Sequence, residues 1–354
     1  MNWFEQKILG LFVKTKGKLS ARILAGQGLI FMLHRVLPEC EREQYILNKD
    51  LAISPEKLEE YILFFKQKGY IFISLEDLSN WLDGKIKLQQ KFICLTFDDG
   101  YRDNLIHGLP VLQKHQVPAT IYVTNCLPNG TALLWWYYFE DYAQKFNSLS
   151  LNSSLGKFVF SWKDSTEAFS QFQQVSEAIK SIPSGELKEV LKRSFELTDE
   201  DIEKQSKAVS LSWDEIKLLS EEPLITIGAH TMSHVSVKQQ NDELVRLEML
   251  NSKLEIERKI GKKVAHFAYP FGGEFDVCQR DLELAASLGF TTSTLNQPGN
   301  IFKSNKSSKQ ALARMPLGNR TEAERMNFYL NGIYHFSNNQ FNYTVKNLKI
   351  KLKK

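Results

Sequence analysis

The sequence contains no run of about 18 apolar residues, the length that a membrane-spanning helix needs. Its N-terminus also lacks the uninterrupted apolar region and the small-residue cleavage site of a signal peptide, so we expect neither a membrane span nor secretion by the ordinary route. Cysteine is scarce, and no two cysteines have C-x-x-C spacing, which argues against a zinc ribbon or a disulfide framework. Reduced thiols and a cytoplasmic location are expected. The cysteines are Cys40, Cys94, Cys126 and Cys278.

A strong charge of either sign is absent as well. The formal net charge of +4 is too small to indicate a nucleic-acid partner, and no nucleic-acid-binding motif occurs. No glycine-rich phosphate loop follows an expected strand, which counts against a nucleotide-binding fold. With 354 residues, of which 43% are hydrophobic, the chain can form one large barrel-type domain with an insertion, or two domains.

Basic residues do gather at the two ends of the chain. Residues 1–27 carry apolar side chains at helical spacing beside several lysines, and residues 336–354 end in a lysine-rich tail. Two interpretations stay open. Either these ends make peripheral contact with an anionic membrane at its inner face, or they form a helix packed on the main domain and a frayed tail. The oligomeric state is unknown from the sequence.

Between these ends, short apolar segments alternate with helical patterns. About eight strands separated by helices, without an internal repeat, predict an α/β fold over residues 28–335, a (β/α) barrel or a close variant of it. The expected strands are Gly28–Leu33, Tyr70–Ile73, the run from Phe92, Ala119–Val123, Leu224–Ala229, Val264–Tyr269, Phe290–Thr294 and Leu312–Met315. The expected helices are 55–68, Ser74–Asp83, Asn104–His115, Asp242–Ile260, Arg280–Leu288 and Thr321–Leu330.

This alternation is interrupted from about residue 127 to residue 210. The segment contains an aromatic cluster at Trp135–Phe139, a Ser/Asn-rich patch at 148–154 and a charged, helix-prone stretch at 186–207. We interpret it as an insertion over the barrel mouth. The aromatic cluster either stacks on the apolar faces of a sugar ring or forms the core of the insertion.

The segment FICLTFDDG at 92–100 is an apolar run that ends in Asp98, Asp99 and Gly100. It predicts a buried parallel strand whose carboxyl end delivers two carboxylates to a site. Adjacent carboxylates on a strand repel and point to opposite sides, so the pair needs a cation or two separate roles. The alternative is a plain turn that closes the strand.

A histidine pair, His230 and His234, follows another expected strand. Histidines four residues apart lie on one face of a helical turn, close enough to share an ion. Together with a carboxylate from a different strand end they predict a two-histidine, one-carboxylate metal site with open positions for water and substrate.

Three motifs, in this order, resemble those of NodB-like polysaccharide deacetylases, carbohydrate esterase family four. They are TFDDG at 96–100, HTMSH at 230–234 and FAYPFG at 267–272. The resemblance covers most of the chain and implies a distorted (β/α)₇ barrel. It also implies that Asp98 is the general base and that Asp99, His230 and His234 hold a divalent metal, usually zinc. Separate roles for the two carboxylates agree with the need for a cation between them.

The sequence departs from the family pattern in two places. The arginine that usually orients the base is replaced by Ala268, and Arg314, at another expected strand end, is the candidate substitute; a surface ion pair is its alternative role. The family's late Leu-x-x-His has no clean counterpart, because His335 follows a helix. Instead FMLHRV at 31–36 resembles the branch that deacetylates poly-N-acetylglucosamine, which makes His34 the expected general acid rather than a core histidine.

The resemblance implies a hydrolase that removes the N-acetyl group from an N-acetylated amino sugar of a cell-envelope polysaccharide or of its lipid-linked precursor. Asp98 is expected to take a proton from water, the Phe271 N–H to stabilise the oxyanion and His34 to protonate the leaving amine. A deformylase of a lipid-linked amino sugar and an inactive carbohydrate-binding relative are the alternatives. The sequence does not identify the glycan, its linkage or its carrier.

Overall fold

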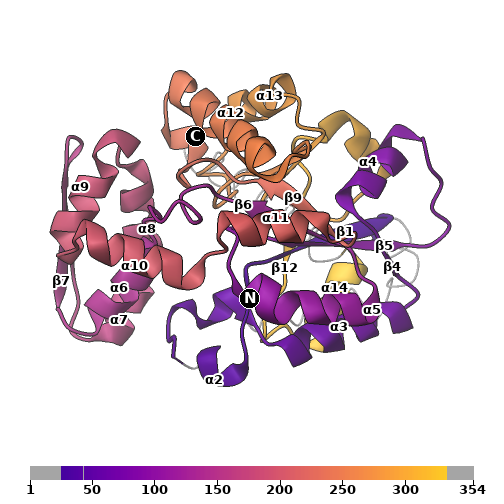
Figure 1. Cartoon of the computed structure of the whole chain (residues 1–354). Helices are drawn as coiled ribbons and strands as arrows, with labels where there is room; N and C mark the ends of the chain where they lie inside the picture. The colour runs from indigo at the N-terminus through magenta and orange to yellow at the C-terminus, as the bar shows by residue number, and fades with distance from the viewer. Residues whose placement is uncertain (1–24, 43, 333–354) are drawn as a thin grey trace, which may run out of the picture.

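The computed structural model describes residues 25–42 and 44–332, and Figure 1 shows its ribbon. Most of the basic N-terminal segment 1–27 and the whole tail 336–354 lie outside the described residues, as does His335. Contact of these ends with a membrane surface therefore stays a prediction.

A parallel sheet forms the centre of the molecule. Its strands follow the order β11-β10-β9-β6-β5-β1-β12, and β4 pairs with the first residues of β5. A parallel bridge from Thr294 to Leu312 links the β11 edge to the chain just before β12, so the sheet curls round and closes irregularly. This confirms the predicted α/β class and the distorted (β/α)₇ barrel. The strands are β1 (Gly28–Leu33), β4 (Ile71–Phe72), β5 (Phe92–Phe97), β6 (Ala119–Val123), β9 (Ile225–Ala229), β10 (His266–Ala268), β11 (Thr292–Thr294) and β12 (Met315–Pro316).

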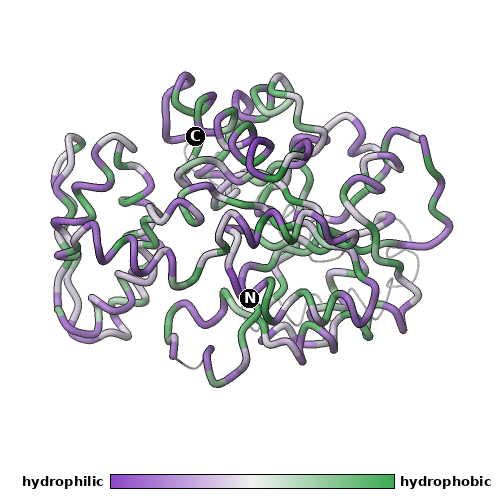
Figure 2. Tube along the Cα trace, in the orientation of Figure 1, coloured by the Kyte–Doolittle hydropathy of each residue, from purple (hydrophilic) through white to green (hydrophobic). Residues whose placement is uncertain are grey.

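Helices pack around this sheet (Figure 1). Every residue of β1 and β5 is buried, as expected for strands that are covered on both faces. Figure 2 shows the matching pattern, with hydrophobic segments through the middle of the barrel and hydrophilic stretches on the outer helices. The barrel helices are α3 (Pro55–Gln67), α4 (Leu75–Asp83), α5 (Leu109–His115), α11 (Trp213–Glu221), α12 (Asp242–Ile260), α13 (Gln279–Ser287) and α14 (Ala323–Leu330).

Several element boundaries differ from the predicted ones. The strands β10, β11 and β12 are shorter than the apolar segments that indicated them, because Phe290 and Leu312 are buried without belonging to a strand. The predicted helix Asn104–His115 is divided, since a π-helical turn at Asn104–Gly108 precedes α5. Hydrophobicity marks burial in the barrel, and it does not mark where the hydrogen-bonded ladder stops.

Residues 127–210, which we call the insertion, form a lobe beside the barrel, at the left of Figure 1. Much of this lobe surrounds a hydrophobic core separate from the barrel core. The Ser/Asn-rich patch forms one strand of a hairpin, because Leu149 and Leu151 alternate with polar residues and are buried. The elements of the insertion are α6 (Trp135–Ala143), β7 (Ser148–Ser153), β8 (Gly156–Ser161), α7 (Ser165–Ser170), α8 (Phe172–Ser181), α9 (Ser184–Phe195) and α10 (Asp199–Val209).

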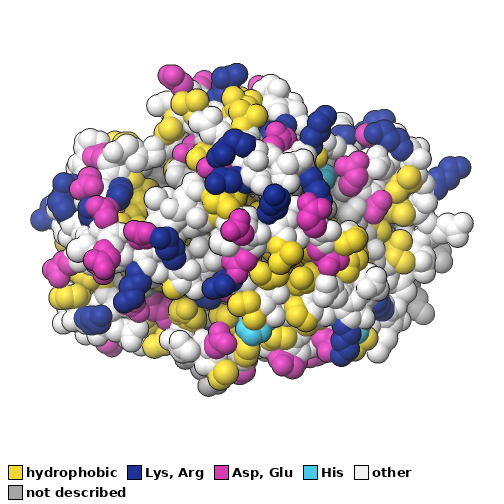
Figure 3. All heavy atoms as spheres, in the orientation of Figure 1, with side chains coloured by type: hydrophobic (Ala, Val, Ile, Leu, Met, Phe, Trp, Pro, Cys, Tyr) yellow, Lys and Arg dark blue, Asp and Glu magenta, His cyan; other side chains and the backbone are white. Residues whose placement is uncertain are grey.

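The segment after β1 forms a smaller wall beside the barrel mouth. Its strands β2 (Arg35–Val36) and β3 (Ala52–Ile53) pair in parallel, and α2 (Glu39–Arg42) lies between them in the chain. On the face drawn in Figure 3, basic and acidic side chains are interspersed rather than separated by sign. Within residues 25–42 and 44–332, no helix combines the length and the apolar character that a bilayer span requires. The four cysteines are free thiols.

His266 on β10 gives the fold a predictable response to acid. It is 1% exposed, its Nδ1 lies 2.8 Å from Thr292 Oγ1, and burial lowers its pKa to about 4. In the unfolded chain its pKa is about 6.5, so below that pH the unfolded state gains a proton that the folded state does not take up until about pH 4. The free energy of unfolding should therefore fall as the pH drops from 6.5 to 4, by as much as about 3 kcal/mol from this residue.

We expect His266→Asn, which cannot titrate, to flatten this dependence. Urea unfolding of the metal-free protein at pH 7 and pH 4.5 measures it, and His107→Asn, at a partly exposed position, is the control. Equal acid sensitivity in His266→Asn and the parent protein would contradict the assignment.

Candidate active site and its relatives

Asp98 and Asp99 lie at the carboxyl end of β5, in a tight turn. The N–H of Gly100 donates to the Asp98 carbonyl at 3.0 Å, across Asp99, whose φ is +75°. This is a γ-turn with a positive central φ, a strained conformation that surrounding contacts must hold. The turn interrupts the strand between the two carboxylates, so Asp98 and Asp99 can meet different partners.

His230 and His234 follow β9 in a loop, and the predicted helical turn is wrong. Thr231 and His234 have φ values of +65° and +57°, which no right-handed helix contains. The loop still brings the imidazoles together, with ring centroids 5.1 Å apart. It does so because the Thr231 hydroxyl accepts a hydrogen bond from the His234 N–H at 3.1 Å and folds the chain back.

These histidines and Asp99 form a compact set of donor atoms. Asp99 Oδ1 lies 3.4 Å from Nε2 of His230 and 3.2 Å from Nε2 of His234, and all three ligand atoms fall within 4.8 Å of one another. Nδ1 of His230 lies 2.7 Å from the Ala268 carbonyl, which can only accept, so Nδ1 carries the proton and Nε2 presents a lone pair.

Asp99 shows that this set fits a cation. Its Oδ1 is buried and forms no hydrogen bond within the described residues. Burial alone would raise the pKa of Asp99, but the facing imidazoles of His230 and His234 outweigh it and hold the pKa well below its usual range. A buried, ionised carboxylate oxygen beside two imidazole nitrogens matches the ligands of a divalent metal with open positions.

Glu248 and Thr124 form hydrogen bonds with the loop that carries His230 and His234. Glu248, 7% exposed on α12, accepts hydrogen bonds from the N–H of Ser233, at 2.9 Å, and from its hydroxyl. The Thr124 hydroxyl donates to the Thr231 carbonyl at 3.0 Å. Residues that fix metal ligands in this way contribute to metal affinity. The sequence pattern indicates neither residue, since a glutamate on a long charged helix carries no distinguishing signal.

Arg314 contacts Asp98 in the manner that the gap at Ala268 suggested. Its two terminal nitrogens lie 2.6 and 2.7 Å from the two oxygens of Asp98, and Thr96 Oγ1 accepts a further bond at 3.1 Å. Arg314 is 1% exposed, so this is a buried pair and no surface ion pair. The predicted contact is present, while its effect on turnover stays a prediction.

The direction of approach differs from the prediction. Arg314 precedes β12 instead of ending a strand, and the register Phe31↔Met315 places it below the mouth. Its guanidinium therefore reaches Asp98 from inside the barrel, past the Tyr122 ring at 5.7 Å. Burial would raise the pKa of Asp98, but Arg314 and the neighbouring imidazoles lower it overall, so the carboxylate is ionised and able to accept a proton.

We expect Arg314→Lys to lower kcat roughly tenfold to a hundredfold with the metal content unchanged, because an ammonium cannot reproduce the two parallel hydrogen bonds. Since the pair is buried, the free energy of unfolding should also fall, by about 1 to 3 kcal/mol. Acetate release, metal analysis and urea unfolding measure the three quantities. Arg280→Lys, which alters an ion pair with Asp281 on the outer helix α13, is the control for stability alone.

Two outcomes would contradict this role for Arg314. One is an unchanged kcat in Arg314→Lys. The other is a double variant with Asp98→Asn that is clearly slower than Asp98→Asn alone, since residues that act as a unit should not add.

His34 lies between β1 and β2 and lines the same cleft as the carboxylates. Burial lowers its pKa, and the charges of Asp99 and Asp98 offset this only in part. A lower pKa makes the protonated imidazole scarcer at neutral pH but a stronger proton donor. The geometry therefore allows His34 to act as an acid, and its role stays a prediction.

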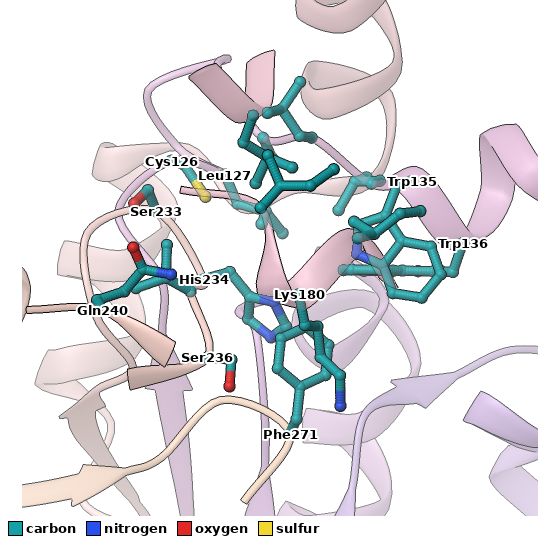
Figure 4. Close-up of a pocket in the computed structure, with 17 residues that line it drawn as sticks. Cys126, Leu127, Trp135, Trp136, Lys180, Ser233, His234, Ser236, Gln240 and Phe271 are labelled. Atoms are coloured by element: carbon teal, nitrogen blue, oxygen red, sulfur yellow. The ribbon is translucent and has the colours of Figure 1, made fainter. Parts of the chain in front are cut away.

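Phe271 lies in a second strained turn. The Gly272 N–H donates to the Pro270 carbonyl at 2.6 Å, and Phe271 has a φ of +61°, so this is another γ-turn with a positive central φ. The Phe271 ring packs on His234 with centroids 4.7 Å apart (Figure 4). Among the hydrogen bonds of the described residues none uses the Phe271 N–H, which leaves this donor free for a ligand.

These groups line one cleft of about 640 Å³. The insertion forms one wall with Trp135, Trp136 and Lys180, and the loop 47–51 and residues 316–321 line it as well. The aromatic cluster Trp135–Phe139 is largely the buried core of the insertion. Its first two members also reach the cleft, and the Trp136 ring lies 5.4 Å from that of His234.

Comparison with known proteins indicates which family this chain resembles. The family profile described as polysaccharide deacetylase matches residues 85–138 and 188–293, and the gap falls within the insertion. The putative polysaccharide deacetylase YxkH of Bacillus subtilis (strain 168) is 32% identical over 76 residues, which cover 22% of this chain. The chain thus matches about a quarter of that relative's length, 27%.

Solved structures share the fold. The deacetylase PplD of Streptococcus pyogenes, determined in complex with acetate, has a TM-score of 0.55 at 16% identity, covering 86% of this chain and 97% of its own. IcaB from Ammonifex degensii has a TM-score of 0.53 at 17% identity, with coverage of 86% and 97%. A de-N-acetylase from Aggregatibacter actinomycetemcomitans has a TM-score of 0.55 at 16% identity, with coverage of 85% and 99%. With the family match on both sides of the gap and the three motifs in place around one cleft, the predicted resemblance to NodB-like polysaccharide deacetylases, carbohydrate esterase family four, is confirmed, and this is a family of hydrolytic N-deacetylases.

Proposed function

We propose that this protein is a metal-dependent hydrolase that removes the N-acetyl group from an N-acetylated amino sugar of a cell-envelope polysaccharide or of its lipid-linked precursor. One observation carries the proposal. Asp98, ionised and held by Arg314, lines the same cleft as the donor set of Asp99, His230 and His234. A base beside a three-ligand metal site is what hydrolysis of an unactivated amide requires.

Asp99, His230 and His234 would hold the metal, and we propose zinc because two imidazoles and a carboxylate are ligands that suit it. When bound, the ion supplies Lewis acidity that polarises the acetamide carbonyl and lowers the pKa of water. The remaining steps fall to the protein. Asp98 takes the proton of the attacking water, and Arg314 fixes the direction in which its carboxylate faces.

Two further residues complete the reaction. As water attacks, negative charge develops on the former carbonyl oxygen. We assign the N–H of Phe271, whose ring packs on His234, as the donor to that oxygen. His34, on the β1 side of the cleft, donates a proton to the departing amine. The products are acetate and a free amino sugar. The N-acetyl group as substrate is supported by the family and by the relatives whose names specify deacetylation.

The test is acetate release by the zinc-loaded protein across a panel of N-acetylated cell-envelope saccharides, including lipid-linked amino sugars, with N-formylated counterparts. Acetate release that requires the metal is expected. Formate release without acetate release would replace the proposal by a deformylase. Tight zinc and glycan binding without hydrolysis of any member would indicate a carbohydrate-binding relative.

A further inference from the structure

The insertion carries a buried lysine that reaches the active site. Lys180, in the last turn of α8, is 9% exposed and lines the cleft together with His234 and Phe271. Figure 4 shows its side chain running alongside the Phe271 ring, close to His234. Lysine is almost never buried unless it is paired, so its partner and its position need an explanation.

The partner belongs to the barrel loop that contains Phe271. Lys180 Nζ lies 2.9 Å from Asp276 Oδ1, and both side chains are less than a tenth exposed. The same ammonium lies 4.7 Å from the centroid of the Phe271 ring and 4.9 Å from that of Phe275. These are ion-pair and cation–π distances, so one cation from the insertion contacts three residues of the loop 270–276.

Stability does not account for this pair. Removing two charges from water costs several kcal/mol per ion, and apolar side chains of similar volume often stabilise such a position better. Polar bonds elsewhere connect the same surfaces without buried ammonium, as where the Ser184 N–H donates to Gln240 Oε1 at 3.3 Å. The position of Lys180 is better explained by its contacts with the loop 270–276.

The loop that Lys180 contacts contains the strained turn at Phe271. Phe271 has a positive φ, and this conformation persists only where its surroundings over-determine it. On the barrel side the loop is fixed by Ser236, whose hydroxyl donates to Asp276 Oδ1 at 2.9 Å, and by the Asn296 N–H, which donates to the Gly272 carbonyl at 3.0 Å. On the insertion side, Lys180 contacts the loop near both of its ends, through the ion pair with Asp276 and the cation–π contact with the Phe271 ring.

We propose that Lys180 is a positioning residue of the active site, which holds the loop 270–276 so that the Phe271 N–H points at the developing oxyanion. The role of that N–H rests on the proposed deacetylation. In this view the insertion is part of the catalytic apparatus, and it acts through one buried charge rather than as a cover over the mouth.

The experiment compares Lys180→Met, Asp276→Asn and the double variant with the parent zinc-loaded protein. Readouts are kcat and KM for acetate release, the Tm, and hydrogen exchange of the amides in 270–278. Lys180→Met should lower kcat at least about tenfold with KM within about twofold, since a loosened oxyanion donor acts on the transition state. Exchange in 270–278 should rise while exchange in the insertion core stays constant. Lys192→Met, which removes a partly exposed lysine paired with Asp199 in the same insertion, is the control.

The double variant separates positioning from folding. Lys180→Met leaves the Asp276 carboxylate buried without its cation, so its Tm should fall, and the added Asp276→Asn should restore much of it. The kcat should stay low, because the neutral pair still does not fix the loop. If Lys180→Met does not fold, the neutral double variant alone decides between these outcomes.

Three results would overturn the inference. They are a parental kcat in Lys180→Met, a recovery of kcat together with Tm in the double variant, and a rise in KM alone, which would make Lys180 a glycan contact. If the parent protein releases no acetate, the proposed function fails by itself. The inference then depends on hydrogen exchange, and unchanged protection of 270–278 in Lys180→Met would refute it.

Discussion

Asp98→Asn should keep its metal and its fold but lose turnover by about 10³ to 10⁴, the upper part of the range for a general base. The amide is nearly isosteric with the carboxylate, and its oxygen can still accept one of the two hydrogen bonds from Arg314, but it cannot take a proton from water. By contrast, Ala at Asp99, His230 or His234 should remove the metal itself, because each supplies one of three clustered ligand atoms. The two adjacent carboxylates should therefore give qualitatively different variants.

Metal analysis of the purified variants, followed by kcat at saturating zinc, measures both effects. Asp281→Asn is the control for the loss of a fully buried carboxylate, since Asp281 lies on α13 and accepts from the Cys278 N–H, away from the cleft. An Asp98→Asn protein as metal-poor as His230→Ala would show that the division of labour between Asp98 and Asp99 is wrong.

His34→Ala is expected to keep the fold and the metal and to lower turnover on N-acetyl sugars by about 10² to 10⁴. An amine leaves only when it is protonated, and His34 is the described imidazole of the cleft that is not assigned to the metal. The loss should be much smaller on 4-nitrophenyl acetate, whose leaving group needs no proton. The ratio of the two kcat values therefore reports on the acid.

Metal content and the urea midpoint of His34→Ala serve as controls for binding and folding. A similar loss on the amide and on the activated ester would contradict the role of His34 as proton donor and would indicate a role in placing the substrate. Near-parental activity on both substrates would show that water or another group, and not His34, is the proton donor.

The candidate site was predictable because its residues follow apolar runs. Asp98, His230 and His34 each come directly after a buried strand, and the carboxyl ends of parallel strands meet at one mouth. Arg314 was predictable for a different reason. It stands 216 residues from Asp98, and only the absence of an arginine at Ala268 indicates that another arginine is needed there.

Other features had no counterpart in the pattern. Thr231 and His234 have positive φ values, which few non-glycine residues adopt, so spacing alone wrongly predicted a helical turn. The Lys180–Asp276 pair joins an insertion helix to a barrel loop, and neither residue differs in its local sequence from the surface lysines and aspartates around it. Contacts of this kind depend on how the insertion packs against the barrel. The spacing of apolar residues along the sequence does not specify that packing.

The strained backbone has a consequence for protein engineering. Asp99, Thr231, His234 and Phe271 all have positive φ and all lie in the candidate site, and each such residue costs of the order of 1 to 3 kcal/mol. A library screened for heat resistance alone should therefore enrich glycine or asparagine at Thr231 and Phe271, where relief of strain is available. The same replacements would remove the stiffness that aims the ligands and the oxyanion donor. Thermostable catalysts are better sought on the outer helices, with these four positions held constant.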